Sequence, residues 1–319
     1  MNRTLRILAS VAALGALPAY VACAGNSNLP PPPPAPNALP AVSTSAPVAS
    51  SAAPPAESST PPAPKPPEVQ LSLGAAAPDP TEKPTVKLTA PAKGQIIPAA
   101  TAGDFDVKLD VKKWPTAPGD AHVHVILDNN PYKPIYDTSK PIKIKDLPGG
   151  ASIAEGHHVL VAFASRATHE SVKGAGAIVV VDFYVGKKTA PAFDLSKPML
   201  VYSRPKGDYK GDMANHVIVD FQLQNVTLAE GKEHVHVKVT GPGIDGAKEA
   251  DAVKFGPPFY LDNLQSGSYT VRLELLGADN KPLAGPWNQT ERVIVIDRSA
   301  PMDSMGHGPS PAPSSSAGH

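Results

Sequence analysis

The sequence HVHV at residues 122–125 occurs again at residues 234–237, 112 positions further along the chain. The correspondence extends without a gap from residues 107–124 to residues 219–236. In both copies apolar and polar residues alternate, which is typical of a strand with one buried face. A repeat period near 110 residues is too long for a solenoid unit and indicates that a whole domain has been duplicated.

The segments around each copy also have the pattern of β-strands. Residues 105–111 alternate between apolar and polar side chains, and residues 157–165 and 177–185 are longer and rich in valine. No stretch has a helical period, and turn residues separate the segments. Short strands at this spacing predict an all-β protein with two tandem β-sandwiches, over residues 84–190 and 191–298.

Each predicted domain resembles the immunoglobulin-like domains of bacterial surface and periplasmic proteins. The resemblance lies in strand number, alternation and a motif near the sixth strand, GHHVL at residues 156–160 and GSYTV at residues 267–271. It implies that His158 and Tyr269 are structural residues at a strand corner, and that the histidine strand is the third strand and pairs with the sixth. The Cys-Trp-Cys core of antibody domains is absent from the sequence.

The same resemblance predicts an unusually apolar outer face on the first domain, formed by Val159, Val161 and Phe163. A face of this kind is not stable in water, so we expect the other domain or a partner to cover it. The equivalent positions of the second domain carry Thr270, Arg272 and Glu274. That face is polar and compatible with solvent.

The N-terminal residues have the features of a secretory signal. Two arginines precede an apolar run at residues 7–22, which is too short to span a bilayer as a mature helix. Residues 20–23, YVAC, resemble a bacterial lipobox, which implies a signal peptide over residues 1–22 and a lipid on Cys23, the only cysteine. Cleavage after Ala24 is the alternative. Lipidation would anchor the protein in the bacterial cell envelope, and Ala24 after the cysteine implies the outer membrane, facing the periplasm or the surface.

Residues 23–83 are dominated by proline, alanine and serine, with five consecutive prolines at residues 30–34. Such a segment cannot bury enough apolar surface to fold, so we expect a disordered spacer, and we expect a second disordered segment at residues 299–319. The 29 basic and 29 acidic side chains give no net charge. Nothing in this balance favours nucleic acid as a partner, and the membrane is expected as a partner only through the N-terminal lipid.

Two histidines separated by one residue on a strand point from the same face, ~6–7 Å apart along the chain. His122 and His124 could therefore bind one metal ion, with His169 from a loop as a third ligand, and imidazole suits copper and zinc. His234 and His236 offer the same pair in the second domain. The competing interpretation is an exposed strand face without a ligand.

The C-terminal segment offers a different group of metal ligands. Met302, Met305 and His307 resemble the Met/His segments of periplasmic copper-handling proteins. Incidental residues of a flexible tail are the alternative interpretation.

The sequence contains no recognisable catalytic motif, such as a nucleophile elbow, a phosphate-binding loop or HExxH, and we expect no enzymatic activity. The first hypothesis is a lipid-anchored envelope protein whose two domains act as a scaffold or bind another envelope protein or a cell-wall component, without a cofactor. The second is a periplasmic copper- or zinc-binding protein. The third is a carbohydrate- or peptide-binding module whose surface is formed by aromatic and basic residues (Trp114, Tyr132, Tyr136 and Arg166).

Overall fold

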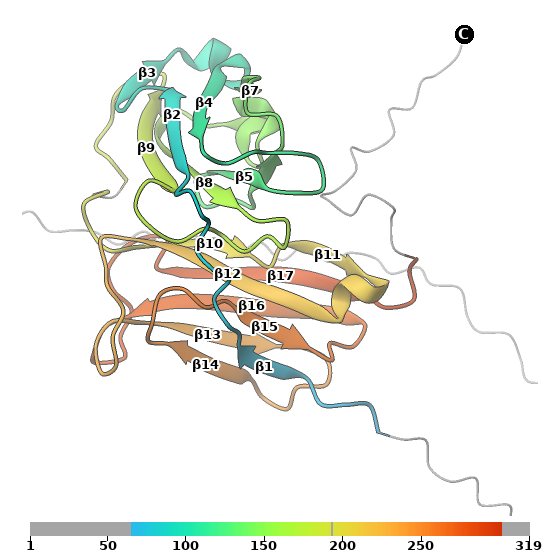
Figure 1. The fold of residues 1–319 in the computed structure, drawn as a ribbon. Helices are drawn as coiled ribbons and strands as arrows, with labels where there is room; N and C mark the ends of the chain where they lie inside the picture. Colours follow the sequence, from blue (N-terminus) through green and yellow to red (C-terminus); the bar gives the residue numbers. More distant parts are fainter. Residues whose placement is uncertain (1–64, 193, 302–319) are drawn as a thin grey trace, which may run out of the picture. The chain divides into compact units, whose positions relative to one another are not determined.

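Two β-sandwiches follow one another in the part of the chain that the computed structural model describes, residues 65–192 and 194–301 (Figure 1). In the first sandwich, a three-stranded sheet has the order β2 (Thr85–Ala90), β4 (Asp106–Lys112), β7 (Ile142–Lys143). It packs on a five-stranded sheet with the order β3 (Gln95–Ile97), β9 (Ile178–Val185), β8 (Gly156–Ser165), β5 (His122–Leu127), β6 (Lys133–Ile135).

The second sandwich repeats this plan. One sheet contains β10 (Met199–Arg204), β12 (His216–Gln224) and β15 (Phe259–Asp262). The other has the order β11 (Gly207–Lys210), β17 (Gln289–Asp297), β16 (Gly267–Leu276), β13 (His234–Thr240), β14 (Lys248–Ala252). In the described residues the helices are short 3₁₀ turns, η1 (Ala99–Asp104), η2 (Ile144–Asp146), η3 (Gly150–Ser152) and η4 (Gly211–Ala214). The prediction of two tandem immunoglobulin-like sandwiches is confirmed.

The two copies share the way in which the first strand changes sheets. β2 and β10 pair with β4 and β12, and each then reaches a proline, Pro91 or Pro205. A glycine with positive φ follows, Gly94 in the first copy and Gly207 in the second. The chain then continues as β3 or β11, which run parallel to the last strand of the opposite sheet. The proline ends the first ladder because it lacks an N–H donor.

The alternation in the HVHV strands sorts the side chains as predicted. Val123, Val125 and Leu127 lie in the core of the first sandwich, and Val235 and Val237 lie in the core of the second. β5 and β13 pair antiparallel with β8 and β16, so the third and sixth strands are neighbours, as the resemblance implied. The histidines therefore point away from both cores.

The apolar outer face predicted for the first sandwich is covered. Val159, Val161 and Phe163 form a buried cluster with Met199, Val201 and Trp287 of the second sandwich. The other domain, and not a separate partner, therefore covers this face, and the two sandwiches share a buried apolar cluster.

One part of the predicted spacer is ordered, which corrects the expectation for residues 23–83. Residues 70–73 form β1 (Gln70–Leu73), which pairs antiparallel with β15 of the second sandwich. Val69 beside it is fully buried in the second core, and Leu71 packs against that core. The residues VQLSL alternate with a period of two, and this short strand covers an edge of β15 that would otherwise lack backbone partners. The signal, Cys23 and the remainder of the spacer before residue 65 lie outside the described residues.

Within the part of the chain that is described, no helix is long and apolar enough to span a membrane.

The corner residues have the structural role that the resemblance implied. The Tyr269 hydroxyl donates to the carbonyl oxygen of Pro242 at 2.7 Å and accepts from the Gln265 N–H at 2.8 Å. His158 Nε2 lies 2.8 Å from the carbonyl oxygen of Ala154, and Nδ1 lies 2.6 Å from Asp128 Oδ2. Both partners of His158 are acceptors, so both ring nitrogens donate and the imidazole is a cation. Burial lowers the pKa of His158, but the hydrogen bond and charge of Asp128 outweigh burial and raise it.

This ion pair predicts a pH-dependent contribution to stability. Because the pKa of His158 is raised in the folded state, its contribution is complete below the unfolded value of ~6.5 and is lost as the pH rises through the folded value. We expect the difference in free energy of unfolding between the wild type and His158→Gln to be largest near pH 5.5 and to shrink toward pH 8.5. Denaturant unfolding across this range measures it. The exposed pair of His216 and Asp262 supplies the control, since His216→Gln should change stability little. A difference that grows with pH would contradict the assignment.

Candidate metal centre

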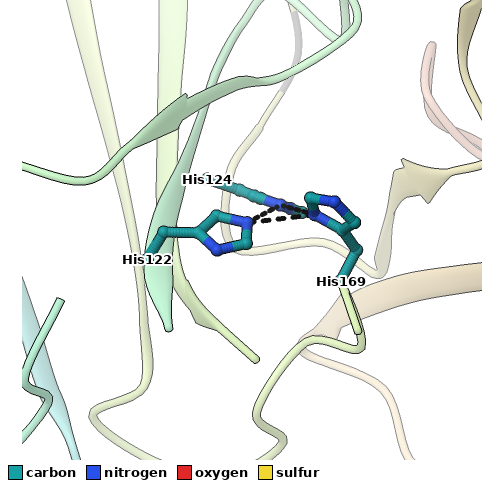
Figure 2. A group of neighbouring side chains, drawn as sticks. All are labelled: His122, His124 and His169. Carbon is teal, nitrogen blue, oxygen red and sulfur yellow. Dashed lines mark hydrogen bonds between the residues drawn. The ribbon is translucent and has the colours of Figure 1, made fainter. Parts of the chain in front are cut away.

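Three histidines meet beside the interface between the sandwiches (Figure 2). His122 and His124 point from the same face of β5, and His169 comes from the turn that follows β8. His122 Nε2 lies 2.9 Å from His124 Nε2 and 3.0 Å from His169 Nδ1. The distance between His124 Nε2 and His169 Nδ1 is 3.4 Å, so the three nitrogens form a small triangle. Among the described residues these three form the one group of histidine, cysteine or carboxylate side chains with ligand atoms this close.

The triangle of nitrogens has the dimensions of a metal site. Its centre lies about 1.8 Å from each nitrogen, so an ion with the usual Zn–N distance of ~2.0–2.1 Å would lie about 1 Å out of the plane. A regular tetrahedral site with such bonds would separate its nitrogens by ~3.3 Å, close to the distances observed. Little movement is therefore needed to bind an ion.

Hydrogen bonds among the three rings alone leave one of the three nitrogens without a proton donor, and the nearest hydroxyl, that of Tyr132, lies 3.4 Å from His169 Nδ1. Each imidazole nitrogen has a single in-plane position, which holds either a proton or a lone pair. One proton can join two nitrogens, but three nitrogens that all face one point cannot satisfy one another in this way. A cation can accept all three lone pairs at once, so the arrangement is compatible with a metal ligand set.

The outer nitrogen of His122 fixes the position of its lone pair. His122 Nδ1 lies 2.8 Å from the carbonyl oxygen of Asp120, which can only accept, so Nδ1 carries the proton and Nε2 is free to bind metal. His124 Nδ1 lies 3.3 Å from the Ser203 hydroxyl of the second sandwich. Burial, followed by the charges of neighbouring His122 and His169, lowers the pKa of His124 well below its usual range. His124 is therefore neutral at physiological pH, the state that metal binding requires.

The turn that carries His169 is itself duplicated. The His169 N–H donates to the carbonyl oxygen of Arg166, and the Asn280 N–H donates to that of Gly277 in the second copy. His169 and Asn280 both have left-handed backbone conformation, with φ of 66° and 57°. Asparagine is among the residues that most readily adopt this conformation. The first copy thus holds an imidazole where the same turn in the second copy holds an amide.

The residues predicted to form an aromatic ligand surface gather around this centre. The Tyr132 ring stacks on His124 with centroids 3.4 Å apart, and the Tyr136 ring lies 4.9 Å from that of His122. Trp114 Nε1 donates to the carbonyl oxygen of His122 at 3.1 Å. Tyr132 is only 1% exposed, so it supports the histidines and is not open to a carbohydrate or peptide. Arg166 is bonded to the carbonyl oxygen of Pro78.

Positive charge from the second sandwich lies near the centre. Lys206 Nζ lies 4.1 Å from the centre of the Tyr132 ring and donates to the Tyr132 carbonyl oxygen. Burial, followed by the charges of Arg204 and Arg292, lowers the pKa of Lys206 to about 8. No carboxylate belongs to the ligand group. An all-imidazole set of this kind disfavours calcium and magnesium, which need oxygen ligands, and suits copper and zinc.

The second copy of the motif has a different environment. His234 Nδ1 faces the carbonyl oxygen of Lys232 at 2.9 Å, as His122 Nδ1 faces that of Asp120. His236 Nδ1, however, pairs with Asp251 on β14 at 2.7 Å. Arg272 Nη2 forms an ion pair with Glu274 Oε1 at 2.8 Å. Among the described residues, His234 and His236 belong to no group of three or more potential metal ligands. The other predicted ligands, Met302, Met305 and His307, lie outside the described residues.

Comparisons with known proteins reveal similarity of fold only. No protein-family model and no curated protein matches the chain. Similar solved structures include the fibronectin(III)-like modules of CbhA from Clostridium thermocellum, with 15% identity, 70% of this chain and 100% of that chain covered, and a TM-score of 0.24. They also include the FN1–FN3 domains of chicken CNTN1, with 9% identity, coverage of 69% and 67%, and a TM-score of 0.21. The tandem V-type regions of VCBP3, a chitin-binding protein, have 8% identity to this chain and a TM-score of 0.21. The match covers 67% of this chain and 99% of that chain. At these values none of them carries a function over to this chain.

Proposed function

We propose that this chain binds one copper or zinc ion through His122 Nε2, His124 Nε2 and His169 Nδ1. The observation that carries the proposal is the convergence of three imidazole nitrogens at 2.9–3.4 Å. Two of these histidines are essentially buried, so their orientation is fixed before an ion arrives. Copper stands first because it has the highest place in the affinity order of divalent ions, and zinc stands second.

Calorimetric titration of the metal-free mature chain with Cu(I), Cu(II) and Zn(II) tests the proposal. We expect one ion per chain with a dissociation constant below about 1 μM, which corresponds to about 8 kcal/mol of binding free energy. A parallel titration of a variant with Met302, Met305 and His307 replaced by alanine separates the folded site from the C-terminal segment. If none of the ions binds this tightly to the folded variant, the three histidines have a structural role and the proposal fails.

We further propose that the protein displays this site in the bacterial cell envelope, anchored by a lipid on Cys23. The support is the signal-like N-terminus with a cysteine at the end of the lipobox-like stretch, followed by a proline-rich spacer. The sandwiches would then face the periplasm or the surface, within reach of another envelope protein or a cell-wall component. Mass spectrometry of the mature N-terminus should find diacylglycerol on Cys23. An unmodified chain that begins at Gly25 would exclude the anchor.

A further inference from the structure

The turn that carries His169 is held by the second sandwich as well as the first. The Ser171 N–H and hydroxyl donate to Asp220 Oδ2 at 3.2 and 2.6 Å. Lys173 Nζ donates to Asp220 Oδ1 at 2.7 Å. Gln222, two residues along β12, donates to the carbonyl oxygen of Val172 at 2.9 Å. Residues 171–173 are thereby hydrogen-bonded at each position to β12, and this set of contacts is called the Asp220 clamp below.

The Asp220 clamp allows only one position of residues 171–173 on β12, because its polar groups are buried. Asp220 is 1% exposed and Gln222 is fully buried. A carboxylate removed from water to this extent needs a cation and several donors, and Lys173 with Ser171 supplies them. Any other placement of residues 171–173 would leave the buried carboxylate of Asp220 without compensation, at a large cost in free energy. The clamp therefore fixes the turn in one position relative to β12.

The ligands on β5 also depend on this neighbour. The Ser203 hydroxyl on β10 lies next to His124 Nδ1, and Phe163, whose ring contacts His124 edge to face, lies in the interface cluster. Contacts of this kind with the outer nitrogens of ligating histidines orient the rings. The second sandwich thus contacts His124 directly and holds the turn that carries His169, although all three histidines belong to the first sandwich.

We infer that the second sandwich positions the metal centre, and that Asp220 is a positioning residue that holds His169 in place through Ser171 and Lys173. The inference rests on the proposed function. Asp220 itself touches none of the ligand nitrogens in the contacts described, so its effect on metal affinity passes through the His169 turn. Because coupling between two sites is reciprocal, bound metal also strengthens the docking of residues 171–173 on β12.

A double-mutant cycle with Asp220→Asn and His169→Ala tests the inference. The affinity of the mature chain for Cu(II) and Zn(II) is measured for the wild type, both single variants and the double variant. Outer-shell partners of metal ligands typically contribute 10–100-fold in affinity, so we expect Asp220→Asn to weaken binding by about 10-fold or more. In the His169→Ala background the same change should have no further effect, because no third ligand remains to be positioned.

Ser171→Ala provides a milder version of the test if Asp220→Asn fails to fold. It removes one hydrogen bond to Asp220 and leaves the Lys173 ion pair in place. We expect a loss of affinity of about 3-fold or more, which again disappears when His169 is absent. Thr290→Val is the matched control, since Thr290 accepts a 2.7 Å hydrogen bond from Asn129 and is not part of the clamp. Its affinity should match that of the wild type.

The outcomes separate the inference from the proposed function. If the wild type binds no metal, the proposed function fails, whatever the variants do. If the wild type binds and both clamp variants bind equally well, Asp220 does not position the centre. A loss that persists undiminished in the His169→Ala background would show a general effect on the fold and would overturn the inference as well.

Discussion

Substitution of His124 by alanine is expected to weaken copper or zinc binding by about 100-fold or more, beyond the range for outer-shell partners. His124 is the fully buried member of the group, and burial lowers its pKa so that the imidazole is neutral. Without it, only two protein ligands remain, one fewer than the three that zinc sites with an open position usually have. Calorimetry or competition with a chelator of known affinity measures the loss.

His236→Ala is the matched control for this experiment. His236 occupies the same position in the duplicated HVHV motif, but its ring pairs with Asp251, and within the described part of the chain it belongs to no group of three potential metal ligands. We therefore expect its removal to leave the affinity for the first ion unchanged. If His236→Ala weakens binding as strongly as His124→Ala, the assignment of the site to the first copy is wrong.

Substitution of Phe163 by alanine should lower the free energy of unfolding by about 3–5 kcal/mol, the usual range for a large buried aromatic side chain. Phe163 is fully buried between the sandwiches, where it packs with Val201 and Trp287. The deletion leaves a cavity in the buried apolar cluster between the sandwiches. Denaturant unfolding in the presence of a chelator measures the effect without a contribution from bound metal.

Val293→Ala is the control for the interface. Val293 is 59% exposed on β17, and an exposed valine of this kind should change stability by no more than about 0.5 kcal/mol. If Phe163→Ala costs less than about 1 kcal/mol, the face is not packed as described. The apolar strands β8 and β9 would then require another cover.

The duplication has produced two sandwiches with the same strand plan. In the described residues, however, only the first contains a group of three potential metal ligands. The two copies share the HxH strand, the hydrogen bond from the first histidine to a carbonyl oxygen two residues earlier, and the left-handed turn after the sixth strand. They differ at one of the three positions, because the turn that carries His169 in the first copy carries Asn280 at the equivalent position of the second. They also differ in burial, because the histidine face of the first copy lies against the second sandwich. The second sandwich instead covers the apolar face of the first.

The sequence by itself determined the strand pattern, the duplication and the faces on which side chains lie. These properties depend on the period of two along a strand, which is local, so His122 and His124 could be assigned to one face and Val159 to an apolar one. His169 could be named as a third ligand because the third and sixth strands of such a fold are neighbours. The corner roles of His158 and Tyr269 followed from the same resemblance.

Only the tertiary structure decided which element covers the apolar face and whether His169 reaches the other two histidines. His169 lies 45 residues from His124 in the chain, and its position depends on a turn with positive φ and on buried contacts with Asp220. The strand at residues 70–73 was hidden in a proline-rich composition, since its partner β15 lies far along the chain. Pairing and burial between distant segments depend on how whole sheets pack, and local alternation carries no information about that packing.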